Sequence, residues 1–181
     1  VTVVIDDEEM LNPNAKRQFR PEARTLHVAR WLHPGQRTFQ LATQIALLTQ
    51  DSLISGIIAA DDQLSDDARG VARIGLANYF AGALLLPYRR FLEAAERARY
   101  DIDQLARRFE VGFETICHRL STLQRPHARG VPFIFVRADS AGNISKRQSA
   151  TAFHFSRVGG NCPLWVVHHA FSRPGQFLTQ V

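Results

Sequence analysis

The side chains best suited to binding chemistry lie in residues 142–165, where cations, hydroxyl groups, aromatic rings and a pair of glycines occur together. Residues 144–149 are expected to form a strand, on which Lys146 and Arg147 face opposite ways. Such groups suit a pocket that holds phosphate and an aromatic base. A basic hairpin with an apolar inner face would have the same composition, so both interpretations stay open. The candidate contact residues of this stretch are Lys146, Arg147, Phe155 and Arg157.

The nucleophiles and metal-binding side chains do not form a recognisable catalytic group. The chain has seven His and two Cys, and they are scattered. The adjacent His168 and His169 cannot face one metal ion from a regular helix, and the His and Cys spacings fit no standard zinc pattern. Cys117 and His118 are neighbours on an expected helix and therefore point in different directions. We expect no metal site, no catalytic residues and no enzyme activity.

Two apolar helical segments, residues 41–47 and 76–87, carry a spacing that is typical of a metallopeptidase. The second reads Leu-Ala-Asn-Tyr-Phe-Ala-Gly-Ala-Leu-Leu-Leu-Pro. This pattern resembles the ImmA/IrrE metallopeptidase-like family, in which the first helix carries two zinc-binding His and a general-base Glu, and the second carries a Glu ligand. The corresponding residues here are Thr43, Leu47, Gln44 and Leu76. A helical zinc site needs imidazoles and carboxylates, so the resemblance implies a peptidase fold without its metal or its chemistry.

Longer phrases resemble the actinobacterial short-chain fatty-acyl transcriptional regulators. The matching phrases are residues 76–87, 120–126, 130–133, 141–150 and 159–165. This resemblance implies a ligand-sensing domain that binds coenzyme A or a short acyl-CoA, within a transcription factor that controls propionate or acetate metabolism. It also implies DNA binding through an N-terminal domain, and an iron–sulfur cluster in a cysteine-rich C-terminal segment, both outside this chain. Two cysteines cannot complete an all-Cys cluster site here.

The same resemblance suggests where the effector would lie. Coenzyme A brings several phosphates, an adenine ring and a thin arm that ends in a small acyl group. The expected phosphate partners are Lys146, Arg147 and Arg157. The ring of Phe155 or Tyr79 would stack on adenine or line the arm. The acyl end would enter the vacated peptidase cleft, whose expected lining is Thr43, Leu47, Leu76 and Phe80.

Residues 101–123 have the spacing of a helix-turn-helix, with Gly112 in the turn. The side chains that a recognition helix would expose are Glu114, Thr115, His118, Arg119 and Thr122. A DNA-reading helix favours Arg, Asn or Gln at base-facing positions, and Glu114 would repel phosphate. We therefore favour a packing role, in which Ile116, Leu120 and Leu123 are buried. The alternative function is a DNA- or protein-interaction module that uses this segment.

The N-terminal elements that must position these residues are strands followed by helices. Strands are expected at residues 1–5 and 24–29, with a polar loop at 6–20 between them. One long helix is expected over residues 38–58. Another starts at an N-cap, Ser65, and ends near residue 86 because Pro87 follows.

The C-terminal elements begin with a helix at residues 88–99 and the helix-turn-helix segment. After a linker at 126–130, strands at 131–136 and 144–149 are expected to form a hairpin around a turn at 141–143. The fold class is therefore α+β, with a mostly helical degenerate zincin-like domain and a small β-containing subdomain. Residues 1–125 and 126–181 are the expected domains, and the second holds the hairpin and part of the ligand-sensing region.

Composition favours a cytoplasmic regulatory domain without a membrane partner. Hydrophobic residues make up 45% of the 181 residues, and the net charge is +5. Arg, Gln or Pro interrupts each apolar run before it reaches membrane-spanning length. Two cysteines without a CxxC pair suggest a reducing compartment. Because the chain starts with Val and shows no signal peptide, we expect a fragment of a longer protein, with a homodimer left open.

Overall fold

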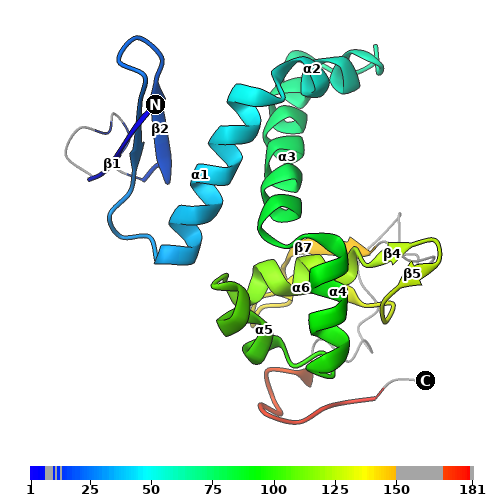
Figure 1. Cartoon of the computed structure of the whole chain (residues 1–181). Helices are drawn as coiled ribbons and strands as arrows, with labels where there is room; N and C mark the ends of the chain where they lie inside the picture. The colour runs from blue at the N-terminus through cyan, green and yellow to red at the C-terminus, as the bar shows by residue number, and fades with distance from the viewer. Residues whose placement is uncertain (7–9, 11, 13, 150–168, 180–181) are drawn as a thin grey trace. The chain divides into compact units, whose positions relative to one another are not determined.

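The structure is a computed structural model that describes residues 1–6, 10, 12, 14–149 and 169–179 (Figure 1). The chain divides into two compact units, Val1–Ile116 and Cys117–Val181. Helices dominate the first unit, and small sheets accompany the helices in both, so the expected α+β fold class is confirmed. The expected domain boundary after residue 125 stays a prediction.

The N-terminal sheet has the strand order β1-β3-β2. Strand β1 (Thr2–Ile5) runs parallel to β3 (Thr25–Val28), and β2 (Arg17–Arg20) runs antiparallel to it. Both expected strands are confirmed, but the loop expected over residues 6–20 is wrong at its end, where β2 forms. Three of the four residues of β2 are polar, and the backbone groups of this strand pair with β3.

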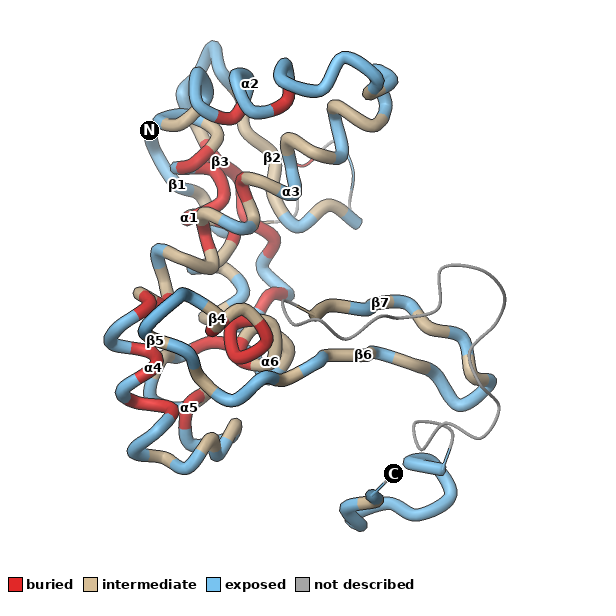
Figure 2. The backbone as a smooth tube through the Cα atoms, turned by 90° about the vertical axis from the view of Figure 1, so that its right-hand side faces the viewer, coloured by how far each residue is buried: buried red, intermediate tan, exposed pale blue. Residues whose placement is uncertain are grey.

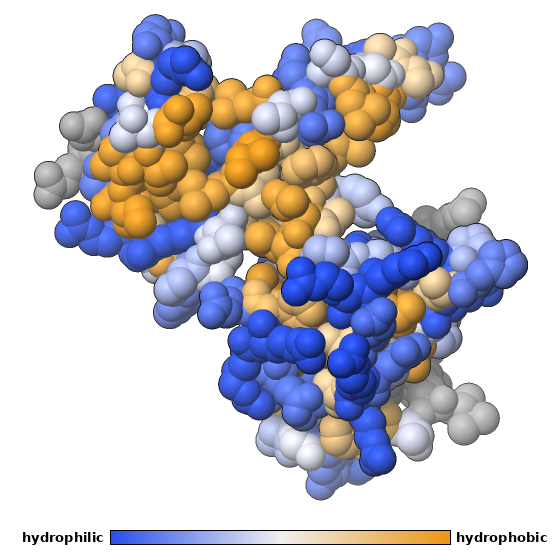
Figure 3. All heavy atoms as spheres, in the orientation of Figure 1, coloured by the Kyte–Doolittle hydropathy of each residue, from blue (hydrophilic) through white to orange (hydrophobic). Residues whose placement is uncertain are grey.

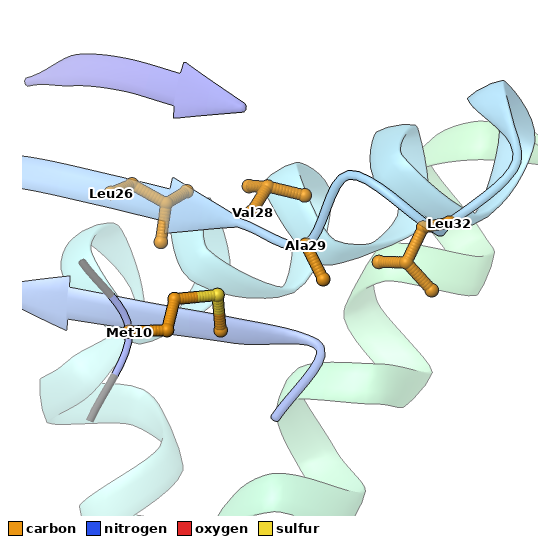
Figure 4. Packing of buried hydrophobic residues seen from close by; sticks show 5 residues of the cluster. All are labelled: Met10, Leu26, Val28, Ala29 and Leu32. Carbon is orange, nitrogen blue, oxygen red and sulfur yellow. The ribbon is translucent and has the colours of Figure 1, made fainter. Parts of the chain in front are cut away.

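Met10, together with buried side chains of β3 and of the segment that follows it, forms the first core cluster (Figure 4). The members of this cluster are Met10, Leu26, Val28, Ala29 and Leu32. Phe19 of β2 packs against it. On β1, Val3 and Ile5 are each 45% exposed, and hydrophobic residues are visible at the surface over this sheet (Figure 3). One face of the sheet is therefore core, while the β1 edge keeps apolar side chains in contact with solvent.

Helices α1 (Pro34–Thr49) and α2 (Asp51–Ala59) replace the single helix expected over residues 38–58, which is wrong. The two axes differ by 75° across a break at Gln50. Gln50 has φ −115° and ψ 19°, outside the helical region. Asp51 then stands in the first turn of α2, where a carboxylate is stabilised by the positive end of the helix dipole. Apolar periodicity alone cannot reveal such a restart.

Helix α3 (Asp66–Leu85) runs beside α1 in the same unit (Figure 1). It begins as expected, with the Ser65 hydroxyl accepting a hydrogen bond from the Ala68 N–H at 3.3 Å. The second core cluster joins the three helices through Ala46, Ile54, Ile58 and Ala77. Alanine at two of these positions lets α1 and α3 approach closely.

Helices α4 (Tyr88–Arg97) and α5 (Ile102–Phe109) follow, with buried positions on both (Figure 2). The fully buried Phe91 packs its ring against Phe109, with centroids 5.3 Å apart. Helix α5 ends at Glu110, which takes a left-handed φ of 53°. Helix α6 (Phe113–Ser121) starts after Gly112. The helix-turn-helix spacing is confirmed, although Glu110 supplies the left-handed residue of the turn.

The C-terminal unit contains two small hairpins. Strand β4 (Gln124–Arg125) pairs with β5 (Ala128–Arg129), so the linker expected over residues 126–130 is wrong where β5 forms. Strands β6 (Ile134–Ala138) and β7 (Ile144–Ser149) form the expected longer hairpin, with β6 starting three residues later than predicted. No single helix in the described ranges has both the length and the apolar character to cross a membrane.

Candidate functional site

The inner face of α1 carries Thr43 at the first of the two positions that hold zinc-binding His in the metallopeptidase pattern. Its side chain is fully buried. The Thr43 hydroxyl donates to the Phe39 carbonyl oxygen at 2.8 Å and lies 3.3 Å from Asn78 Oδ1 on α3. Thr43 therefore links two packed helices. A hydroxyl in this bonding pattern is not a zinc ligand.

Gln44, at the position of the general base, is engaged by a cation from the sheet. Arg17 on β2 donates from Nη1 to Gln40 Oε1 at 2.6 Å and from Nε to Gln44 Oε1 at 3.4 Å. Gln40 and Gln44 are buried, and Arg17 is half-buried. Burial lowers the pKa of the Arg17 guanidinium, because desolvation disfavours its charge. A neutral amide bonded to Arg17 cannot serve as a general base.

The apolar residues expected to line the vacated cleft pack against the second core cluster. Leu47, Leu76 and Phe80 are partly buried there. Tyr79 differs, because 63% of it is exposed. Within the part of the chain that the structure describes, no three His, Cys, Asp or Glu side chains lie together as metal ligands. The residues at the four metallopeptidase positions do not fit zinc, and their assignment to an acyl group stays a prediction.

The β6–β7 hairpin positions the basic residues of the C-terminal unit. Lys146 lies directly opposite Arg137, and Arg147 lies opposite Val136. Residues at directly opposite positions share a face, so two cations meet on one side of the hairpin. Arg137 Nε donates to Ser145 Oγ at 2.8 Å. Lys146 is half-buried and Arg147 is exposed. The arrangement presents three cations along one hairpin, on both of its faces.

The turn of this hairpin is fixed by Asp139. Its carboxylate accepts hydrogen bonds from the Ala141 and Asn143 backbone N–H groups at 3.0 and 2.9 Å, and from Asn143 Nδ2 at 2.9 Å. The side-chain and backbone hydrogen bonds from Asn143 lower the pKa of Asp139. Gly142 takes a φ of 86°, which a side chain would disfavour. The sequence Asp-Ser-Ala-Gly-Asn thus sets the register that brings Arg137 to Lys146.

The α5–α6 segment packs its apolar side chains into the protein. Ile116, Leu120 and Leu123 are buried, as expected. Arg119, which a recognition helix would expose, is only 7% exposed. The His118 Nδ1 contacts Gln148 Oε1, and its ring meets the Phe135 ring edge-on at 4.9 Å. Helix α6 therefore supports the basic hairpin.

The predicted contact residues fall into separate groups. Lys146 and Arg147 share β7, while Leu76, Tyr79 and Phe80 share α3 in the other unit. Phe155 and Arg157 lie outside the described residues. Arg137 and Arg17 were missed by the sequence prediction. The hairpin register around residues 141–143 was the available signal for Arg137, whereas Arg17 fell in a segment expected to be a loop.

Two family models match this chain in succession. Residues 4–121 match the IrrE N-terminal-like domain, and residues 122–181 match the C-terminal domain of the short-chain fatty acyl coenzyme A regulators. The first covers more than half of the chain and ends where α6 ends. The second contains both hairpins of the C-terminal unit.

Similar proteins are transcription regulators by name. The chain is 70% identical over its full length to the HTH-type transcriptional regulator PrpR of Mycobacterium tuberculosis, covering 37% of that protein. It is 57% identical over 84% of its length to the propionyl-CoA carboxylase regulator of Cereibacter sphaeroides, covering 33% of it. It thus spans about a third of the length of these relatives.

A solved structure described as a Mycobacterium tuberculosis transcriptional regulator has the same fold. It aligns with a TM-score of 0.87 and 71% identity, over 97% of this chain and 53% of the other. The structural alignment and the two family models together each cover nearly the whole chain. The chain therefore belongs to the family with an IrrE N-terminal-like domain, joined here to the C-terminal domain of a short-chain fatty acyl coenzyme A regulator.

Proposed function

We propose that this chain is the effector-binding region of a transcription regulator, that it binds coenzyme A or a short acyl-CoA, and that it cleaves no peptide. The observation that carries the proposal is the β6–β7 hairpin, where Arg137 faces Lys146 and Arg147 follows. The relatives' names support it, since they refer to transcription and to propionyl-CoA carboxylase. In this proposal DNA is bound by a domain outside this chain, in the cytoplasm.

The hairpin suits phosphate for an electrostatic reason. Two like charges at directly opposite positions of a strand pair repel each other and weaken the pair. A phosphate group placed against Arg137 and Lys146 reduces that repulsion and accepts charge-assisted hydrogen bonds. The bond from Arg137 to Ser145 limits where the guanidinium can lie. Coenzyme A carries several phosphates, which makes it a ligand of matching charge.

The α1 residues support the absence of peptidase activity. Thr43 bonds within its own helix and lies against Asn78, and Gln44 accepts from Arg17. Hydrolysis at a helical zinc site needs a metal-bound water and a carboxylate that takes its proton. Neither residue supplies such a group. The IrrE-like domain then serves as a scaffold, which is consistent with relatives named for regulation.

The alternative, DNA reading by α6, receives less support. His118 contacts Gln148 and Phe135 of the hairpin, and Arg119 is buried. Side chains that read base edges must reach into the groove. Salt-dependent binding of this chain alone to DNA would favour the alternative, because phosphate contacts release counterions.

Calorimetric titration of the chain with propionyl-CoA tests the proposal. We expect Arg147→Glu to weaken binding at least tenfold, since loss of a charge-assisted contact costs about 1.5–3 kcal/mol and each 1.4 kcal/mol is about tenfold. Arg129→Glu is the matched control, because Arg129 is an exposed cation on β5 of the same unit. It should bind as the wild type does. Equal affinity of the Arg147→Glu and Arg129→Glu variants would contradict the phosphate assignment.

A further inference from the structure

Arg17 is a cation on the core-facing side of a sheet. It shares a face of β2 with Phe19, two residues away, which packs against the first core cluster. Its partner in register is Val28, which is fully buried. The side chain therefore extends toward α1, where its guanidinium meets Gln40 and Gln44. Arg17 occupies this place because the strand alternation leaves no other direction for its side chain.

Among the described residues, the acceptors that bond to Arg17 are neutral. In the described residues, no carboxylate lies within ion-pair distance of Arg17. A guanidinium has five N–H donors, and within the described part of the chain two of those of Arg17 have acceptors, both amide oxygens. Partial burial makes a charge costly, and it lowers the pKa of the Arg17 guanidinium by desolvation. An anion at this point would offset that cost.

We propose that Arg17, Gln40 and Gln44 form a binding site for a carboxylate group. The guanidinium fork matches the two oxygens of a carboxylate, and the remaining Arg17 donors are not used by described protein groups. The Gln40 and Gln44 side chains turn their oxygens to Arg17, which leaves their amide N–H groups as further donors. One cation and two neutral amides suit a single negative charge better than a phosphate dianion.

The identity of Gln44 strengthens this assignment. It stands where the peptidase pattern has a glutamate, and glutamine has the shape of glutamate without its charge. A glutamate here would pair with Arg17 inside the protein. With the neutral Gln44 at this position, Arg17 can pair with a carboxylate from outside the protein. A small free acid or the C-terminus of a peptide would supply that carboxylate. This site is independent of the proposed acyl-CoA contacts on the hairpin.

Thermal unfolding of the full chain with added anions tests the site. Acetate and N-acetylglycine represent the two carboxylate sources, and sodium chloride and sodium phosphate at matched ionic strength are the comparisons. We expect at least one carboxylate to raise Tm by about 2 °C or more beyond chloride, at concentrations several times its Kd. The proposal is overturned if chloride or phosphate raises Tm as much as both carboxylates do.

Three variants assign the effect to these residues. Arg17→Gln should abolish the carboxylate-dependent rise, while Arg24→Gln should keep it, since Arg24 is an exposed cation just before β3. Gln44→Glu should raise Tm without ligand and remove the response to acetate, because the new carboxylate pairs with Arg17. If Arg17→Gln fails to fold, Gln44→Glu decides alone. An undiminished acetate response in Gln44→Glu would overturn the proposal.

Discussion

At the scale of single residues, Thr43 has a structural role at a position where the metallopeptidase pattern has a His. Thr43 is buried and donates to the carbonyl of Phe39, four residues before it. It also lies against Asn78 on the neighbouring helix. A His at this position would replace a small bonded side chain with a ring in a packed interior. Thr43 therefore contributes packing and a hydrogen bond at this position.

Thr43→Val tests this role directly. Valine keeps the branched shape but removes the hydroxyl, leaving Asn78 Oδ1 without that contact, so we expect a loss of about 1–3 kcal/mol in the free energy of unfolding. Thr49→Val is the control, because Thr49 donates to the Ile45 carbonyl at the same 2.8 Å but is exposed. Urea unfolding of both variants checks the expectation. Equal losses would mean that the Thr43–Asn78 contact contributes nothing.

At the scale of elements, the start of α1 is fixed by close packing against the α5–α6 turn. A Cβ atom on Gly35 would lie 2.3 Å from the Glu110 carbonyl oxygen and 3.2 Å from the Val111 Cα. Glu110 is the left-handed residue that ends α5. Backbone atoms cannot move aside as a flexible side chain can. The glycine therefore sets how closely the two segments approach within the N-terminal unit.

Gly35→Ala should accordingly destabilise the chain by about 1–3 kcal/mol, the usual range for overpacking. Gly56→Ala on α2 is the matched control, because an added Cβ there meets no atom within 4 Å. In an open helical position alanine stabilises by about 0.5–1 kcal/mol. The two variants should thus shift the urea midpoint in opposite directions. A stabilising Gly35→Ala would show that this contact is not tight.

The α5–α6 segment provides a second prediction at this scale. Leu120 is 2% exposed, so Leu120→Ala should cost about 2–5 kcal/mol of stability. His118→Ala should leave DNA binding by a longer protein that contains this chain unchanged, because His118 contacts Gln148 and Phe135. Unfolding curves and a DNA titration provide the two measurements. Relaxed base specificity at unchanged stability would mean that α6 reads DNA.

The sequence predicted elements well where one pattern dominated. The Ser65 cap, the β7 strand and the α5–α6 spacing are confirmed because a cap residue, a turn and an apolar stripe mark them. The break at Gln50 was missed because apolar residues continue in helical spacing through it. Strand β2 was missed because three of its four residues are polar, so only Phe19 marks the side that faces the core.

At the scale of the whole molecule, the candidate site was predicted only in part. Lys146 and Arg147 lie on a strand as expected from alternation along residues 144–149. The place of Arg137 follows from the β6–β7 register, which the turn at residues 141–143 could have indicated. The place of Arg17 depends on packing of β2 against α1, which local sequence does not encode. A carboxylate site at Arg17 and a phosphate-binding hairpin would give the two units different ligand chemistry.

The most direct test of the central claim is native mass spectrometry of the purified chain, mixed with propionyl-CoA and zinc chloride in one sample. A domain that senses acyl-CoA and has lost its metallopeptidase chemistry should retain one propionyl-CoA per chain and no stoichiometric zinc. The Arg147→Glu variant should lose the propionyl-CoA peak under the same conditions. Zinc retained at one ion per chain, without any bound propionyl-CoA, would contradict the account.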